Sequence, residues 1–395
     1  MSLRADLFCR VVDNYGDIGV CWRLARRLAQ GKDWRMRLWV DDLHAFARIQ
    51  PGINSAAARQ QHAGVEIIHW QKAAPVPLPG PGDVVIEAFA CDPPAEFVDA
   101  MRARAACPVH GAGASTPPIW INLEYLSAED WVESFHTLSS QRADGLVKYF
   151  FFPGFTSATG GLLREPGLAA ARDALQASRA AQNDFLRRLG LDETSLAVHR
   201  QGARVLTLFC YPGAPTDALA QALRLRPGST LMLVPESVAP GLDAHTGGTL
   251  RIARVPFVGQ PDFDRLLWCA DLNFVRGEDS FVRAAWAARP LVWQIYPQDG
   301  NTHLQKLEAW LARYPAPETA RILAQAWNKE SRDQDAATPG LPPTPGLADA
   351  LEAALAEPAW GAWRAAAHAW DAEQASGPDL AENLAIFCAE KLKTR

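Results

Sequence analysis

The segment Asn273–Tyr296 combines an arginine, carboxylates and a helix start within two dozen residues. Its pattern predicts a strand, a polar turn, a short helix, an Arg-Pro break and a second strand. A helix that begins at Asp279 and Ser280 would direct its first N–H groups and the positive end of its dipole toward a ligand above the strand. Arg276 could add a bidentate charge, which favours an anion such as phosphate. The residues leave an alternative open, in which Asp279 and Ser280 only cap the helix and Arg276 is a solvated strand end.

A second candidate site lies near the N-terminus, where Asp13 and Asp17 occupy the turn between the first strand and an amphipathic helix that starts at about Ile18. In an open α/β sheet, ligands bind outside the carboxyl ends of the strands, which is where this turn falls. A carboxylate pair could hold a cationic group or accept a proton. The alternative is that Asp17 caps the helix and Asp13 closes an Asx turn. The fragment Gly16–Gly19 is not a GxGxxG fingerprint, and no Asp or Glu at the right distance clearly ends a second strand, so a nicotinamide cofactor is poorly supported.

The composition limits the classes of protein to consider. A chain of 395 residues is too long for one core and predicts two domains. A net charge of −5 argues against a basic nucleic-acid binder and against a polybasic membrane contact. No apolar signal region or bilayer-length apolar run is present, which predicts a cytoplasmic protein. Seven cysteines without CxxC spacing and histidines without HxxxH spacing indicate neither a metal site nor a disulfide framework.

These candidate sites must be positioned by strands that alternate with helical patterns, which is typical of parallel sheets with crossover helices. The strands expected in the first half are Ala5–Val12, Met36–Val40, Val65–Trp70, Val84–Ala88, Ile119–Glu124 and Lys148–Phe152. Those expected in the second half are Val205–Tyr211, Thr230–Pro235, Ile252–Val255, Leu272–Val275 and Leu291–Ile295. The pattern predicts two doubly wound α/β sheets.

The connecting and terminal segments are predicted to be helical for the most part. Pro166–Gly190 has no internal Pro or Gly and predicts one long helix, followed by a linker near Leu191–Gly202. Helical pattern is broken at Pro358 and runs again through Trp363–Trp370 and Asp379–Lys393. This C-terminal tail could cross back onto the first domain.

Three motifs carry a resemblance to a known family. They are Asp13-Asn-Tyr-Gly-Asp-Ile-Gly-Val-Cys-Trp-Arg-Leu-Ala25, Arg276-Gly-Glu-Asp-Ser280 and Trp293-Gln-Ile-Tyr-Pro-Gln298. Together they resemble the EarP family, the protein-arginine rhamnosyltransferases that modify bacterial translation elongation factor P. The resemblance covers nearly the whole chain.

The resemblance implies a GT-B glycosyltransferase, with two Rossmann-like domains facing across a cleft. The expected acceptor domain is 1–190, the expected nucleotide-sugar domain is 191–365, and residues 366–395 are helices that could pack on the first domain. It also implies the donor dTDP-β-L-rhamnose, elongation factor P as the protein substrate, inversion at the sugar carbon, and no metal ion or further cofactor.

The family's donor site can be carried over residue by residue. It falls on Phe257 and Gln260 for the thymine, Phe209 and Tyr211 for the nucleotide sugar, and Arg276, Asp279, Ser280 and Tyr296 around the diphosphate and sugar. An aromatic ring gives a base a stacking face, although core packing is the commoner fate of a Phe.

For the acceptor, the resemblance implies Asp13 and Asp17, with Glu278 as a third carboxylate. A guanidinium stays protonated, so carboxylates must orient one nitrogen and receive a proton as the new bond forms. We expect Asp17 to be the general base and Asp13 to orient the arginine, and this division rests on the resemblance alone.

Two other functions stay open at this point. A GT-B enzyme that acts on a glycan or small molecule would share the donor residues. A non-catalytic nucleotide-sugar-binding scaffold would also share them but would not need carboxylates on the acceptor side.

Overall fold

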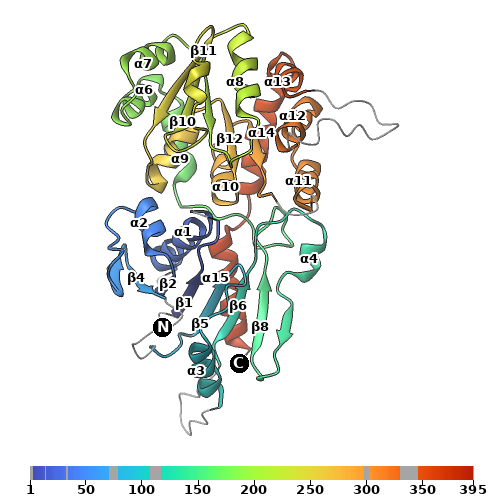
Figure 1. The fold of residues 1–395 in the computed structure, drawn as a ribbon. Coiled ribbons are helices and arrows are strands. Elements are labelled where there is room, and N and C mark those ends of the chain that lie inside the picture. The colour runs from blue at the N-terminus through green and yellow to red at the C-terminus, as the bar shows by residue number, and fades with distance from the viewer. Residues whose placement is uncertain are drawn as a thin grey trace. The chain divides into compact units, whose positions relative to one another are not determined.

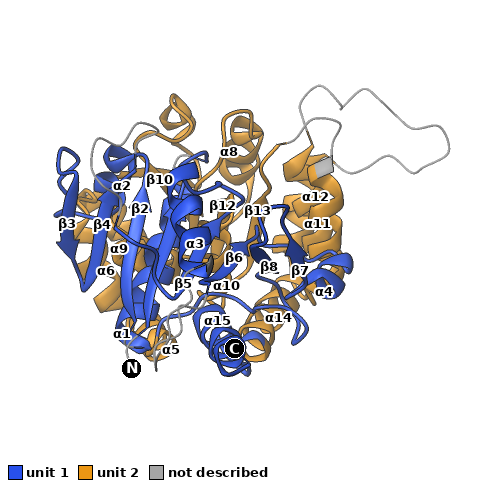
Figure 2. Ribbon diagram, turned by 90° about the horizontal axis from the view of Figure 1, so that it is seen from below, with its two compact units in different colours: residues 1–165, 374–395 blue, residues 166–373 orange. Residues whose placement is uncertain are grey.

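The computed structural model describes residues 3–13, 15–32, 34–70, 79–106, 117–297, 302–329 and 346–394. Asn14 and Gln298 of the predicted motifs lie outside this part of the chain. Contacts divide the chain into two compact units (Figures 1 and 2). Unit 1 comprises Met1–Glu165 and Gln374–Arg395, and unit 2 comprises Pro166–Glu373.

Unit 1 is built on an eight-stranded sheet with the order β3-β4-β2-β1-β5-β6-β8-β7. Its strands are β1 (Arg4–Cys9), β2 (Arg35–Val40), β3 (Arg59–His62), β4 (Val65–His69), β5 (Val84–Ala88), β6 (Ile119–Leu123), β7 (Ser139–Gln141) and β8 (Val147–Phe151). β3 and β7 pair antiparallel at the two ends of the sheet, and the other pairings are parallel. The strand order changes direction between β1 and β5, so the carboxyl ends of these strands form a topological switch point.

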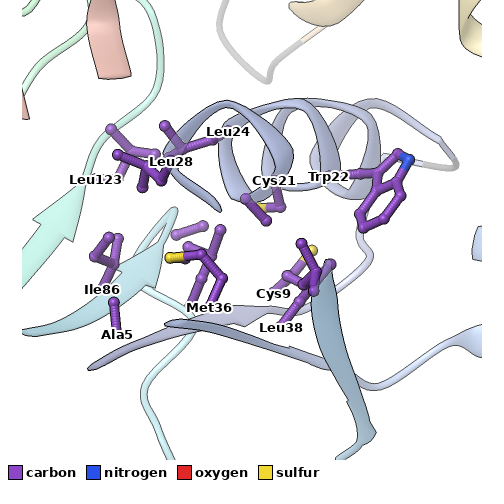
Figure 3. Close-up of a cluster of buried hydrophobic side chains, with 14 of the residues drawn as sticks. Ala5, Cys9, Cys21, Trp22, Leu24, Leu28, Met36, Leu38, Ile86 and Leu123 are labelled. Atoms are coloured by element: carbon purple, nitrogen blue, oxygen red, sulfur yellow. The ribbon is translucent and has the colours of Figure 1, made fainter. Parts of the chain in front are cut away.

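The helices of unit 1 are α1 (Gly16–Gly31), α2 (Leu43–Ile49), α3 (Ala95–Ala106), α4 (Trp131–Phe135) and α15 (Leu380–Lys393). A core cluster of buried side chains joins α1 to one face of the sheet (Figure 3). Cys21, Trp22 and Leu28 recur at helical spacing along α1, and alternate residues of β1 face them, as an amphipathic helix on a buried sheet requires. This packing fixes the β1–α1 turn that carries the predicted carboxylates.

The C-terminal helix α15 belongs to the same core. Leu380, Leu384 and Phe387 are buried in the cluster formed by α1 and the sheet. The Asp379 side chain caps the helix by accepting hydrogen bonds from the Ala381 and Glu382 N–H groups. The tail helix therefore packs in unit 1, although it is far from that unit in sequence.

Unit 2 contains a five-stranded parallel sheet with the order β11-β10-β9-β12-β13. Its strands are β9 (Arg204–Leu208), β10 (Thr230–Pro235), β11 (Leu250–Val255), β12 (Leu272–Arg276) and β13 (Leu291–Gln294). Its helices are α5 (Leu168–Gln176), α6 (Arg179–Arg188), α7 (Glu193–Arg200), α8 (Thr216–Leu225), the 3-10 helix η1 (Leu242–His245), α9 (Gln260–Cys269), α10 (Asp279–Ala285), α11 (Thr302–Arg313), α12 (Glu318–Asn328), α13 (Leu347–Leu355) and α14 (Ala359–Ala375). The switch point of this sheet lies between β9 and β12. Two doubly wound α/β units confirm the predicted fold class.

Two predictions about the connecting segment are wrong. Pro166–Gly190 is not one helix, because Ser178 adopts an extended conformation and caps a new helix by accepting the Ala181 N–H at 3.1 Å. Leu191–Gly202 is not a linker, because Asp192 caps α7 in the same way.

The unit boundaries also differ from the expected domains. Contacts separate the chain after Glu165 rather than after residue 190, because Phe185 and Leu186 of α6 are buried with Val205 and Leu231 of the second sheet. The C-terminal segment that joins unit 1 begins at Gln374 rather than at residue 366. Across the described ranges, each helix is either too short or too polar to cross a bilayer.

Candidate functional site

The eight residues expected to bind the donor all lie at or just after the carboxyl ends of strands in unit 2. Phe209 and Tyr211 follow β9, Phe257 and Gln260 follow β11, Arg276, Asp279 and Ser280 close or follow β12, and Tyr296 follows β13. Because these strands are parallel, their carboxyl ends lie at one edge of the sheet. This edge is where an open α/β sheet binds ligands.

Arg276 lies at the switch point with its guanidinium over two aromatic rings. The guanidinium carbon is 4.6 Å from the ring centroid of Phe209 and 4.4 Å from that of Tyr211. Both distances fall within the range of cation–π contacts, which contribute about 0.5–1 kcal/mol at exposed sites. The two rings were expected along one side of a strand, but β9 ends at Leu208, and each ring instead contacts the Arg276 guanidinium from the loop that follows.

The loop that carries Tyr211 is held by β13. The Gln294 side chain accepts the Tyr211 N–H at 2.7 Å, and both residues are buried. The Tyr296 ring stands edge-on to the Tyr211 ring at 5.4 Å and is itself exposed. Gln294 belongs to the Trp293–Gln298 motif, yet its function as an anchor was not predicted. Its partner is the backbone of a distant loop, and the spacing of residues around Gln294 does not indicate such a contact.

Ser280 fixes the turn between β12 and α10. Its hydroxyl accepts the Arg276 N–H at 3.1 Å and donates to the Arg276 carbonyl. The N-cap position of α10 is Glu278, whose side chain makes no capping bond. Simple capping by Ser280 is therefore not what the structure shows, and the hydroxyl instead holds the backbone of the arginine.

Phe257 and Gln260 lie on the β11 side of the same edge. Phe257 is an exposed ring in the loop between β11 and α9, so it is not a core residue. Gln260 is buried at the first position of α9. Phe263 of α9 stands edge-on to Phe209 at 5.6 Å, which joins the β11 and β9 parts of the edge.

In unit 1, Asp17 ties the β1–α1 turn together from the first turn of α1. One of its carboxylate oxygens accepts the Val12 and Asp13 N–H groups, each at 2.8 Å. Both donors precede the helix, and the N-cap position is Tyr15 without a side-chain capping bond. Asp17 therefore does not cap α1, which contradicts the simple structural alternative.

The environment of Asp17 favours its protonated form. Its side chain is almost fully buried at 3% exposure, and this burial is the main cause that raises its pKa above the ordinary value. The two backbone N–H groups lower the pKa, the nearby charge of Asp13 raises it, and a hydrogen bond with Tyr125 lowers it. A carboxylate with a raised pKa is a stronger base than an exposed one.

Asp13 and Asp41 complete the turn. Asp13 is half-buried, and its carbonyl accepts the Gly16 N–H at 2.7 Å. Asp41 directly follows β2, and its carboxylate accepts the Val11 N–H at 2.9 Å. These bonds also end β1 at Cys9, three residues before the predicted Val12, because the Val11 and Val12 N–H groups leave the sheet ladder.

Tyr125, which hydrogen-bonds to Asp17, and Phe89, which packs against Tyr125, were not predicted. Tyr125 follows β6, and its ring stacks on Phe89 at 4.3 Å. Phe89, Ala90 and Asp92 all have positive φ after β5, a conformation that non-glycine residues rarely adopt. No local pattern marks these residues, because only the parallel pairing of β1, β5 and β6 brings them to the switch point.

Glu278 lies at the start of α10 in unit 2 and is half-buried. His303 is buried at the second position of α11. Within the described ranges, no three or more His, Cys, Asp and Glu side chains gather in an arrangement that could hold a metal ion.

Comparisons with known proteins agree with one another. The family model described as "Elongation-Factor P (EF-P) rhamnosyltransferase EarP" matches residues 5–389. A protein-arginine rhamnosyltransferase of Pseudomonas putida is 45% identical over 99% of this chain and 100% of its own length. One of Pseudomonas aeruginosa is 46% identical over 98% of this chain and 99% of its own length.

Solved structures give the same result at the level of the fold. A structure described as "Structural basis for EarP-mediated arginine glycosylation of translation elongation factor EF-P" aligns with a TM-score of 0.62 and 32% identity, over 98% of this chain and 99% of that one. Phytolacca americana UGT2, solved with UDP-2-fluoro-glucose and pterostilbene, aligns with a TM-score of 0.53 and 11% identity over 99% of both chains. The second likeness concerns the fold alone.

Proposed function

Because this chain belongs to the EarP family and has the GT-B glycosyltransferase fold, we propose that it transfers L-rhamnose from dTDP-β-L-rhamnose to an arginine of translation elongation factor P. The coarser function, a protein-arginine rhamnosyltransferase, follows from the family. The observation that carries the finer proposal is the buried Asp17, held at the switch point of unit 1 beside a second carboxylate.

The donor edge of unit 2 supports binding of a nucleotide diphosphate. Arg276 supplies a cation whose orientation is set by two aromatic faces. Phe257 offers an exposed ring on which a thymine could stack, and Gln260 follows it at the first position of α9. In the proposed complex, Arg276 neutralises the diphosphate as it departs, and Ser280 holds the backbone of Arg276 in place. Asp279 and Tyr296 contact the sugar.

The acceptor edge of unit 1 supports attack by a guanidinium. A protonated guanidinium is a poor nucleophile, since its pKa lies above about 12. In the proposed reaction, the carboxylates of Asp13 and Glu278 orient the acceptor guanidinium. Asp17 accepts one N–H proton as the nitrogen–carbon bond forms at the anomeric carbon. The bond from that carbon to the diphosphate oxygen breaks in the same step, and dTDP carries away the electron pair.

Further features belong to the same proposal. Attack on the face opposite dTDP converts the β-linked donor into an α-linked rhamnosyl-arginine in a single displacement. Charge neutralisation by Arg276 means that the scheme requires no metal ion and no cofactor besides the donor. A cytoplasmic location fits a translation factor as the substrate.

The direct test is incubation of the purified protein with dTDP-β-L-rhamnose and intact elongation factor P. We expect mass spectrometry to find one deoxyhexose on one arginine, NMR of the product to show the α anomer, and chelation by EDTA to leave the rate unchanged. A β-linked product would contradict the single displacement. Transfer only to glycans or small molecules would contradict the acceptor.

A further inference from the structure

Unit 1 carries a ridge of exposed apolar residues next to the candidate acceptor site. The ridge consists of Tyr125, Trp131, Phe135 and Leu138, whose side chains are 42%, 48%, 48% and 49% exposed. All four belong to one stretch of chain that runs from the end of β6 through α4 to the start of β7. Contiguous exposed apolar side chains on a protein surface mark interaction sites more often than single ones do.

The ridge is continuous with the carboxylates at the switch point. Tyr125 hydrogen-bonds to Asp17, so one end of the ridge touches the candidate base. α4 follows the carboxyl end of β6, and Leu138 pairs through its carbonyl with the Phe150 N–H at 2.9 Å, near the carboxyl end of β8. Figure 1 shows α4 beside β8 in the same unit. The ridge therefore extends from Asp17 along the carboxyl edge of the sheet.

The ridge is also held rigidly from beneath. The Trp131 ring stands edge-on to the buried Phe152 ring at 5.5 Å and to Phe135 at 5.7 Å. His136 accepts the Phe152 N–H at 3.0 Å, and burial lowers its pKa to about 4, which keeps the ring neutral as this bond requires. Rigid aromatic anchors lose little conformational entropy when a partner binds.

Its charge identifies the kind of partner. The stretch from Glu124 to Leu138 contains four acidic residues, Glu124, Glu129, Asp130 and Glu133, and no Lys or Arg. The nearby cations Arg142 and Lys148 form ion pairs with Asp144 and Glu87. An acidic border around an aromatic centre is complementary to a basic protein surface. A second copy of this chain, with a net charge of −5, is a poorer fit.

We propose that the ridge is the docking surface for the acceptor protein, and that it contacts the basic surface around the target arginine. This inference rests on the proposed function and adds the place of recognition to it. A stable interface needs about 20 residues on each side, so these four side chains form the centre of the footprint. Ser139–Gln141 of the edge strand β7, all exposed, would belong to its polar border.

The test is the double substitution Trp131→Ala/Phe135→Ala, assayed with intact elongation factor P as the varied substrate. We expect kcat/KM to fall by roughly 10-fold or more, as for other aromatic anchors at interfaces. Melting temperature and dTDP affinity serve as checks of folding. The matched control is Ile386→Ala, which truncates a side chain of 47% exposure on α15 of the same unit and should leave kcat/KM unchanged.

Two further measurements keep the proposal falsifiable if the double variant fails to fold. Asp130→Lys should reduce kcat/KM more at low salt than at high salt. Hydrogen–deuterium exchange of the unmodified chain should show protection of residues 124–141 when elongation factor P is added.

No protection of residues 124–141, or unchanged kcat/KM in a folded double variant, would overturn the docking surface. Loss of self-association with unchanged kcat/KM would assign the ridge to a second copy. No transfer by the wild-type enzyme would instead overturn the proposed acceptor.

Discussion

The two sheets of this enzyme place their candidate sites in the same position but build them around different charged groups. Each sheet has a switch point beside its first strand, between β1 and β5 in unit 1 and between β9 and β12 in unit 2. The first carries Asp13 and Asp17, and the second carries Arg276. The topology therefore decides where a ligand binds, while the residues at the strand ends decide whether a cation or an anion is bound.

The two sites also differ in how the charged group is held. Asp17 is fixed by two directional hydrogen bonds from backbone N–H groups, at 2.8 Å each. The Arg276 guanidinium lies over two rings, whose contacts are less directional. A base must aim at one proton, whereas a cation that neutralises a diphosphate can tolerate some movement. Substitutions at each site test this contrast.

The largest effect is expected for Asp17→Asn. The amide oxygen can still accept the Val12 and Asp13 N–H groups, so the turn and the fold should be retained. Loss of the base should reduce kcat by about 10² to 10⁴. Rates of transfer to elongation factor P and dTDP affinity should be measured together, and the dTDP affinity should stay at the wild-type value.

Asp17→Ala is the matched variant, because it removes both the charge and the acceptor. Leaving the two N–H groups without their acceptor should cost about 1–3 kcal/mol of the free energy of unfolding for each bond. A stable Asp17→Asn protein with a normal rate of transfer would show that the carboxylate is only an anchor. That result would remove the proposed role of Asp17 as the general base.

The second effect concerns Arg276. Arg276→Ala should weaken dTDP binding by about 10- to 100-fold, since hydrogen bonds to charged groups contribute about 1.5–3 kcal/mol. Arg276→Lys should give an intermediate loss, because an ammonium keeps the charge but cannot lie flat on the rings of Phe209 and Tyr211. Calorimetric titration with dTDP gives both affinities. Equal affinity for Lys and Arg at this position would show that the aromatic faces do not orient the cation.

The sequence predicts the site residues better than it predicts the residues that hold them in position. Asp17 and Arg276 could be named because each follows a predicted strand within a motif, and Phe257 because the family's donor site could be carried over to it. Tyr125 could not, because it reaches Asp17 only through the parallel pairing of β1 with β5 and β5 with β6. Such contacts depend on strand order, which a single sequence does not specify.

Errors in the predicted elements have a similar origin. The strands were predicted to be longer than β1 and β9 are, since apolar residues continue beyond Cys9 and Leu208. The backbone leaves the sheet there because side chains at the ends of neighbouring strands, Asp41 after β2 and Gln294 in β13, accept its N–H groups. By contrast, the helix break at Ser178 could have been found, because serine is a strong N-cap residue.

The third effect concerns Gln294, which holds the Tyr211 loop at the donor edge of unit 2. Gln294→Leu removes the acceptor of the buried Tyr211 N–H, which should cost about 1–3 kcal/mol of the free energy of unfolding. The loop should also lose its position, so dTDP affinity should fall less than in Arg276→Ala. Gln294→Glu keeps an acceptor oxygen and should restore part of both quantities. Thermal unfolding with and without dTDP measures them, and an unchanged melting temperature for Gln294→Leu would contradict the anchor.

The smallest effect is the dependence of stability on pH that Asp17 contributes. Burial raises its pKa above 3.8, so the folded state holds the proton at pH values where the unfolded state has released it. The free energy of unfolding must then fall as pH rises from below 3.8 through the raised pKa, and stay level above it. Asn does not titrate, so the stability of the wild type minus that of Asp17→Asn isolates this group from other buried carboxylates.

The rate of transfer should follow the titration of Asp17 with the opposite sign, since only the deprotonated carboxylate is a base. Urea unfolding of both proteins between pH 3 and pH 8, with transfer rates at the same points wherever the enzyme stays folded, measures the two curves. A stability difference that grows with pH would show that hydrogen bonds from the Val12 and Asp13 N–H groups outweigh burial, and would make Asp17 a weaker base than an exposed carboxylate.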